Sequence, residues 1–142
     1  MLTSMFGMNA VADYMMLNYL HSQIMAGLPG QWGQRDPELT RAALARPFLT
    51  AFGRDIYDDH FKKAAAMLDA ITNNIVFKDG NKRTALAAAS LYLALNDTVI
   101  EFAQQEAEWF MYQVVVARPS IDEIAGWLRA HAVGSADAKK LA

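Results

Sequence analysis

The pattern of hydrophobic and polar positions along the chain predicts a series of helices. Apolar residues recur three or four positions apart in stretches that open at a polar capping residue and close at Gly, Asn or Pro. These stretches cover about residues 9–26, 36–47, 59–74, 84–95, 104–117 and 120–134. The chain is therefore expected to form an all-α domain.

The stretch 84–95 differs from the others because it is apolar almost all round and contains five alanines. A helix without a polar face is expected to be buried, and small side chains let its neighbours approach closely. The other helices are expected to bury one face each: Val11, Tyr14, Leu17, Leu20 and Ile24; Phe61, Ala64, Ala65, Leu68, Ile71 and Ile75; Trp109, Phe110 and Val114; Ile121, Ile124 and Leu128.

Two segments between the helices have other patterns. In residues 47–57, β-favouring residues flank Gly53, so this segment forms either a small hairpin or an ordinary surface connection. Residues 27–36 have the turn chemistry of a loop. Trp32 in this loop is expected to cover the core, and the alternative is that it belongs to a surface for a partner.

Composition narrows the class of protein. The chain has 142 residues, of which 54% are hydrophobic and 20% charged, so residues 1–134 are expected to form one globular domain and 135–142 a mobile or weakly helical tail. A net charge of −2 does not favour nucleic-acid binding, and the lack of cysteine excludes disulfides. No stretch reaches the roughly 20 apolar residues that span a bilayer, so a soluble cytoplasmic protein is expected.

The segment from Phe77 to Arg83 has the composition of a phosphate site. The first amides of a helix lack partners and lie at the positive end of its dipole, so Gly80 and Asn81 can offer backbone N–H groups to phosphate oxygens. Asp79 suits Mg²⁺, which proteins usually hold with one or two carboxylates plus substrate phosphates. Lys82 and Arg83 would neutralise further phosphate charge.

The same seven residues have an ordinary structural explanation. Asp79 and Gly80 can form a turn, Asn81 can cap a helix, and Lys82 and Arg83 can be a solvated first turn. On these residues alone the two explanations are about equally good. Two cations at the positive end of a helix are unfavourable unless an anion binds there, which favours the phosphate site.

This segment resembles the signature loop of the Fic/Doc family, His-x-Phe-x-Asp-Gly-Asn followed by Gly or Lys and then Arg. The likeness extends through Gly27–Gly30, Arg35–Pro37 and Ala43–Pro47, and downstream to about Ala132. It implies a helical bundle around a buried central helix, with a flap beside the active loop that aligns the target. The flap would be the 47–57 segment, and Phe77 would anchor the loop in the core.

Within the family the chain is similar to the Doc (death-on-curing) toxin branch. Lys82 stands where Fic proteins have a second glycine, and Leu86 where they usually have a second arginine. The resemblance implies transfer of the terminal phosphate of ATP to a threonine of elongation factor Tu, with ATP and Mg²⁺ as cofactors. Many Fic proteins carry an inhibitory helix with a Ser/Thr…Glu motif that this sequence lacks, so a separate Phd-like antitoxin is the expected partner.

One departure from the family pattern affects catalysis directly. Ile75 occupies the position of the catalytic His, and an aliphatic side chain cannot take a proton from a target threonine. His60 is expected about 22 Å away at the other end of its helix, and His21 and His131 belong to other helices. The chain is thus expected to be inactive as given, whether Ile75 is natural or was introduced to allow production of a toxin.

Two other functions remain open at this point. An AMP-transferring Fic enzyme would keep the same loop, although Lys82 and Leu86 argue against it. A non-catalytic protein that retains the nucleotide or antitoxin surface would account for Ile75 if that residue is natural.

Overall fold

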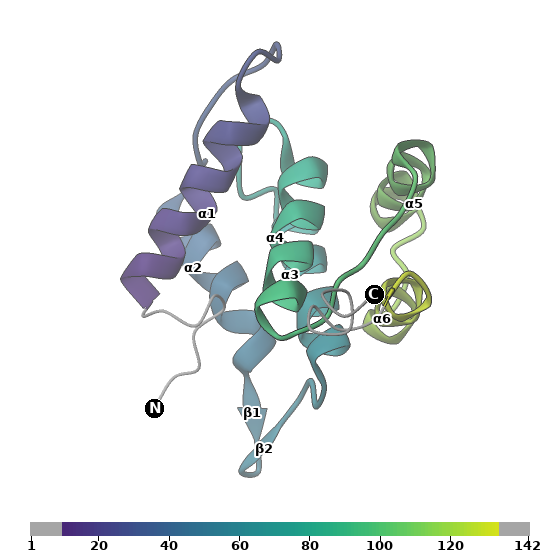
Figure 1. Cartoon of the computed structure of the whole chain (residues 1–142). Coiled ribbons are helices and arrows are strands. Elements are labelled where there is room, and N and C mark those ends of the chain that lie inside the picture. The colour runs from purple at the N-terminus through teal and green to yellow at the C-terminus, as the bar shows by residue number, and fades with distance from the viewer. Residues whose placement is uncertain (1–9, 134–142) are drawn as a thin grey trace.

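The computed structural model describes residues 10–133, and this part of the chain is an all-α domain with one small hairpin. The elements, in chain order, are α1 (Ala10–Met25), α2 (Pro37–Ala45), η1 (Arg46–Phe48), β1 (Thr50–Ala51), β2 (Arg54–Asp55), α3 (His60–Asn73), α4 (Asn81–Leu95), α5 (Gln104–Val116) and α6 (Ile121–Ala130). In Figure 1, α3 and α4 form the middle of the domain, with α1 and α2 on one side and α5 and α6 on the other. The predicted cap at Asn9 and the predicted tail 135–142 lie outside the described residues.

Three helices begin at the capping residues that the sequence predicts. The Asp36 side chain accepts a hydrogen bond from the Glu38 amide at 2.9 Å, ahead of Pro37 in the first helical position. Asp59 caps α3 in the same way. Ser120 and Glu123 form a complete capping box at the start of α6.

The core is centred on α3 and α4, as expected for the buried central helix. Both helices are buried over most of their length, and α3 packs mainly on α4 and α6. His60 at the start of α3 lies 2.7 Å from the hydroxyl of Tyr92 near the end of α4, so the two helices run antiparallel. Burial, with Asp55 and Asp59 nearby, raises the pKa of Tyr92 to about 12, so this phenol stays neutral.

The predicted hairpin is present, but it does not lie where the resemblance placed it, beside the loop of residues 74–80 that joins α3 to α4. This loop, the predicted phosphate-binding segment, is called the phosphate loop below. Strands β1 and β2 pair around Phe52 and Gly53 and precede α3, whereas the loop that follows α3 leads into α4. The length of α3 therefore separates the two, about 21 Å for 14 residues at 1.5 Å each. Figure 1 shows the hairpin and the α3–α4 connection at opposite ends of the domain.

Three of the residues expected to face the core point outward instead: Ile75, which is described with the site below, and Val11 and Trp109. Val11 is 70% exposed and Trp109 is 64% exposed. In α5 the buried positions are Ala107, Phe110, Met111 and Val114, a spacing that leaves Trp109 on the opposite side. Trp109 stacks on Tyr112, one turn further along that outer face.

Helix α1 is unusual because two of the four residues on its inner face are polar while several apolar residues on its outer face are exposed. Its buried positions are Asp13, Leu17, His21 and Met25, whereas Val11, Met15 and Tyr19 are exposed. No helix within residues 10–133 is long and apolar enough to cross a membrane.

Candidate functional site

The loop between α3 and α4 is closed by the side chain of Asn81. Its amide accepts a hydrogen bond from the Phe77 N–H and donates one to the Phe77 carbonyl, each at 2.8 Å. Phe77 itself is fully buried, as expected for the loop's anchor. The Asn81 side chain is therefore fixed against Phe77, and its backbone N–H points out of this pairing as a group that a phosphate could use.

The N-terminus of α4 has the features of an anion site. Gly80 is the residue before the helix, with φ +79° and no side chain to cap the first amides. The amides of Asn81, Lys82 and Arg83 therefore have no partner inside the helix. The side chains of Lys82 and Arg83 are exposed at this end of α4. An anion here would meet free N–H groups, the positive end of the helix dipole and two cations.

Asp79 connects this loop to the segment after α1. Its Oδ2 accepts a hydrogen bond from the backbone N–H of Gln31 at 2.6 Å, and a Cβ on Gly30 would lie 3.1 Å from the same oxygen. Gly30 has φ +129°, a conformation that favours glycine. Within residues 10–133, Oδ1 of Asp79 has no such partner and is left for a metal.

The residues around Asp79 fit Mg²⁺ only if phosphates complete the coordination. No group of three or more His, Asp or Glu side chains that could hold a metal occurs in the described part of the chain. One carboxylate oxygen would be the protein's ligand to Mg²⁺, and phosphates bound by the amides at the start of α4 would supply further oxygen ligands.

The segment that lies beside the phosphate loop is residues 30–35, here called the strap. Gln34 and Phe77 form an antiparallel bridge, flanked by hydrogen bonds from the Arg35 amide to the Val76 carbonyl (2.9 Å) and from the Lys78 amide to the Gly33 carbonyl (3.0 Å). The sequence predicts a loop here but not its pairing. The strap therefore has the position that was expected of the 47–57 segment.

The strap is tied to the helices around it. The side-chain amide of Gln34 donates a hydrogen bond through Nε2 to the Tyr14 hydroxyl of α1 and accepts one at Oε1 from the Thr40 hydroxyl of α2. Trp32 in the strap is 53% exposed, so it does not cover the core as expected. Its indole instead forms part of the surface beside the loop.

Ile75, where the resemblance placed a catalytic His, does not extend the buried face of α3 as expected. The helix ends at Asn73, and Ile75 has φ +50° and is 49% exposed. Hydrogen bonds from the amides of Ile75 and Val76 to the carbonyls of Thr72 and Ile71 are those of a Schellman motif. Gly or Asn usually occupies this left-handed position, so a β-branched residue is strained there.

Arg35 holds the Ile75 turn in place. Its Nε donates to the Ile75 carbonyl at 2.6 Å and its terminal nitrogen to the Asn74 carbonyl at 3.2 Å. These carbonyls at the end of α3 have no partner inside the helix, and a cation is favourable at the negative end of the dipole. The side chain of residue 75 is thus presented to solvent from a fixed backbone next to the phosphate loop.

His21 is a neighbour of the site that the sequence did not identify. It lies on α1, is 2% exposed, and stacks on Phe77 with 3.8 Å between ring centroids. Neither ring nitrogen has a hydrogen-bond partner among the described residues. A histidine four residues before a helix end carries no signal for this contact, which depends on how α1 packs on the loop. His60 and His131 have other partners, Tyr92 for the first and Trp127 and Glu106 for the second.

The burial of His21 predicts a pH dependence of folding stability. Burial lowers its pKa below the ordinary 6.5, so the unfolded chain takes up a proton in a pH range where the folded protein does not. The free energy of unfolding should therefore fall as the pH drops below about 6.5, by at most about 1.4 kcal/mol per pH unit from this group. Urea titrations between pH 5 and pH 8 would measure this slope. The slope should decrease in His21→Phe, and an equal slope in both proteins would contradict the assignment.

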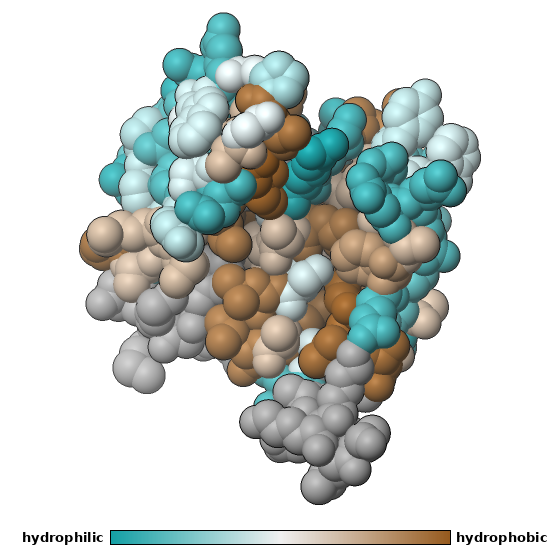
Figure 2. Space-filling view, turned by 45° about the horizontal axis from the view of Figure 1, so that its top comes forward, coloured by the Kyte–Doolittle hydropathy of each residue, from teal (hydrophilic) through white to brown (hydrophobic). Residues whose placement is uncertain are grey.

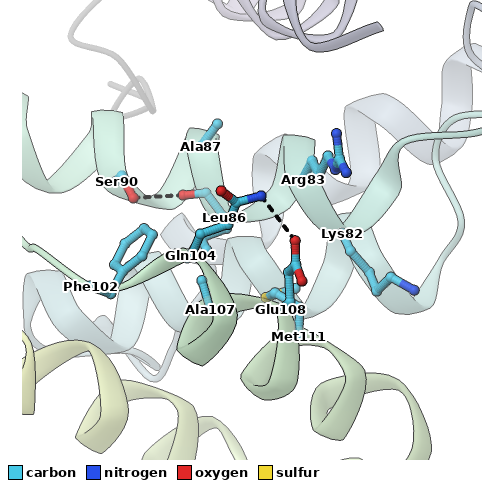
Figure 3. Close-up of a pocket in the computed structure, with 10 residues that line it drawn as sticks. All are labelled: Lys82, Arg83, Leu86, Ala87, Ser90, Phe102, Gln104, Ala107, Glu108 and Met111. Carbon is cyan, nitrogen blue, oxygen red and sulfur yellow. Dashed lines mark hydrogen bonds between the residues drawn. The ribbon is translucent and has the colours of Figure 1, made fainter. Parts of the chain in front are cut away.

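A groove of about 630 Å³ lies between α4 and α5, with Lys82 and Arg83 at one end. Its apolar lining includes Leu86, Ala107 and Met111, and Glu108 and Gln104 form part of the rim (Figure 3). Figure 2 shows a hollow with a hydrophobic floor between two more hydrophilic flanks. Leu86, where the resemblance placed a second arginine of Fic proteins, contributes an apolar surface in this groove.

Comparison with known proteins shows the family of this chain. The Fic/DOC family model matches residues 12–93, which is more than half of the chain and includes most of α1, the strap, the loop between α3 and α4, and most of α4. A protein named Toxin Doc from Mycolicibacterium smegmatis is 38% identical over 108 residues, which cover 75% of this chain and 83% of the relative. The chain therefore belongs to the Fic/DOC family.

Proposed function

We propose that this protein is a Doc-like toxin of a toxin–antitoxin pair, built on a protein phosphotransferase that uses ATP and Mg²⁺. The observation that carries this proposal is the convergence, at the N-terminus of α4, of uncapped amides, the exposed cations Lys82 and Arg83, and the free oxygen of Asp79. The similarity to Toxin Doc supports the toxin assignment.

In the proposed reaction, the threonine oxygen of a target protein forms a bond to the terminal phosphorus of ATP, and the bond to the β-phosphate oxygen breaks to release ADP. The amides of Gly80, Asn81, Lys82 and Arg83, with their side-chain cations, hold the phosphates and stabilise the charge that develops on them. Asp79 would hold Mg²⁺, which neutralises phosphate charge when bound. The threonine proton must go to a base.

The base position explains why the chain as given is proposed to be nearly inactive. Residue 75 lies beside the loop and faces solvent, which suits a group that must reach an incoming hydroxyl. Ile75 cannot accept a proton, and general-base assistance is typically worth about 10²–10⁴-fold. His21 is buried under the loop and cannot reach such a hydroxyl from there.

The target would lie along the strap. One edge of the strap pairs with the phosphate loop through the Gln34–Phe77 bridge, and a strand-like pairing with its other edge is a recognised way to hold an extended peptide. Trp32 would contact the target on this side. Elongation factor Tu is the target we propose, by resemblance to Doc toxins, and the site of action would then be the cytoplasm.

The proposed restraint is a Phd-like antitoxin. The groove between α4 and α5 offers the apolar floor that an amphipathic segment needs when it folds on binding. Because Lys82 and Arg83 lie at one end of this groove, a segment bound there would also obstruct the phosphate site.

Two other functions share the same loop. AMP transfer would need the second arginine's position to bind phosphate, and Leu86 on the groove floor is unsuited to this. A non-catalytic binder would keep the anion site and have lost only the base at residue 75.

The phosphate site can be tested through Asp79. The unmodified protein should bind Mg-ATP at least about tenfold more tightly than it binds ATP in EDTA, because Mg²⁺ links the Asp79 carboxylate to the phosphates. In Asp79→Ala this link is lost, so we expect Mg²⁺ to have no effect on ATP affinity. Isothermal titration calorimetry with and without Mg²⁺ measures both affinities.

Asp79→Asn is the matched control for this experiment. Its amide oxygen can still accept the hydrogen bond from Gln31, so the strap should stay in place, but the charge that binds the metal is gone. Both variants should therefore lose the Mg²⁺ effect. If either variant kept the full difference between Mg-ATP and ATP, Asp79 would not be the metal ligand.

A further inference from the structure

His21 occupies a position where its polarity has no structural use. Both ring nitrogens are buried without partners among residues 10–133, and leaving such groups unpaired costs about 1–3 kcal/mol each. A leucine or phenylalanine would pack against Phe77 without that cost. The hydroxyls of Thr72 and Thr84 are also unpaired, but a helical threonine can rotate its hydroxyl toward the carbonyl four residues earlier, which an imidazole ring cannot do.

The ring of His21 points its polar edge at the start of α4. The space that a Cβ on Gly80 would fill has Cε1 of His21 at 3.7 Å and Sδ of Met25 at 2.7 Å. Cε1 is the carbon between the two ring nitrogens, so this edge faces the residue that precedes the uncapped amides. The thioether of Met25, a flexible side chain, thus occupies the space beside Gly80 that a Cβ would need, next to the ring of His21.

We infer that His21 is a binding residue of the phosphate site, and that one of its ring nitrogens hydrogen-bonds an anion held at the N-terminus of α4. This inference rests on the proposed phosphate site and adds a ligand from α1 to it. The buried ring is neutral at pH 7, because burial lowers its pKa, and a neutral ring carries one N–H that can donate to a phosphate oxygen. Met25 moves aside when the anion binds.

The inference also accounts for one of the buried polar positions of α1. A helix that exposes Val11, Met15 and Tyr19 while burying His21 breaks the usual rule for a helix on a core. Such local conflicts are expected at functional sites. At His21, the buried polar side chain lies next to Gly80 of the phosphate loop.

The test uses inorganic triphosphate in EDTA, so that no metal takes part, and NMR of the full chain labelled uniformly with ¹⁵N, in which both histidine ring nitrogens and backbone amides are observed. The chain has three histidines, and single substitutions assign their ring signals. Triphosphate should shift the ring nitrogens of His21 and leave those of His60 and His131 in place. Backbone amides of residues 80–83 report in the same samples whether the anion binds at α4.

His21→Phe separates a binding role from a packing role. Phenylalanine keeps the stacking on Phe77 and removes both unpaired nitrogens, so the free energy of unfolding should stay equal or rise. Triphosphate affinity should nevertheless fall about tenfold, as expected for a lost hydrogen bond to a charged group. His21→Gln, which keeps a side-chain N–H, should retain part of the affinity.

The outcomes distinguish this inference from the proposed function. If triphosphate shifts the amides of residues 80–83 but not the ring of His21, and His21→Phe binds it as tightly as the unmodified chain, His21 is not a ligand and the phosphate site stands without it. If the amides of residues 80–83 do not respond at all, the proposed phosphate site is wrong and the inference falls with it.

Discussion

Replacing Ile75 by His should raise the rate of phosphate transfer from ATP by about 10²–10⁴-fold, the usual contribution of a general base. The backbone already supports a functional side chain there. Residue 75 is the left-handed residue of a Schellman motif, its carbonyl is held by Arg35 at 2.6 Å, and its side chain faces solvent next to the phosphate loop. The substitution therefore adds the missing group to a preformed position.

The same substitution should stabilise the fold. A left-handed conformation costs an L-residue about 1–2 kcal/mol, and β-branched residues are especially poor there, whereas Asn and His are enriched. We expect a gain of about 1 kcal/mol in the free energy of unfolding for Ile75→His, measured by urea denaturation. Ile75→Asn is the matched control, because it relieves the same strain without supplying a base.

Activity and stability should thus separate in these two variants. Both should be more stable than the unmodified chain, and only Ile75→His should transfer phosphate. Transfer by Ile75→Asn at a similar rate would show that residue 75 is not the base. A loss of stability in both variants would contradict the strained turn at the end of α3.

Replacing Phe77 by Ala should destabilise the protein by about 3–5 kcal/mol, the usual cost of truncating a buried phenylalanine. Phe77 is fully buried, stacks on His21, and has both backbone groups bonded to the Asn81 side chain. Its removal leaves a cavity under the phosphate loop and loosens the strap that pairs with it. Denaturant unfolding measures the loss, and Phe77→Leu, which fills most of the space, should lose much less.

The same variants test whether the loop needs its anchor. At a temperature where Phe77→Ala remains folded, triphosphate affinity should fall, because the amides at the start of α4 are no longer held by a fixed loop. Unchanged affinity in a folded Phe77→Ala protein would mean that α4 alone organises the site.

The sequence predicted the parts of the fold that depend on neighbouring residues. Asp36 before Pro37, Asp59, and Ser120 with Glu123 mark helix starts through hydrogen bonds to amides two or three positions away, and each forms as expected. The run 84–95 lacks a polar face, which is enough to predict its burial. The candidate phosphate-binding residues could likewise be picked out from the sequence, because they follow one another between Phe77 and Arg83.

The features that were missed depend on tertiary packing. The hairpin lies at the opposite end of α3 from the phosphate loop, and the strap pairs with that loop instead. No local sequence pattern predicts whether the hairpin or the strap lies beside the loop. Ile75 was misplaced because its residue type argues against the left-handed turn that it adopts. His21 was missed because its importance comes from Phe77 and Gly80, more than fifty residues away.

The measurement that tests the central proposal most directly uses ATP labelled at either the terminal or the innermost phosphate. The unmodified chain and Ile75→His are each incubated with Mg²⁺, labelled ATP and elongation factor Tu. We predict that only Ile75→His labels the factor, only from the terminal phosphate, and on a threonine. Label from the innermost phosphate would mean AMP transfer, and no label with Ile75→His would contradict a phosphotransferase that lacks only its base.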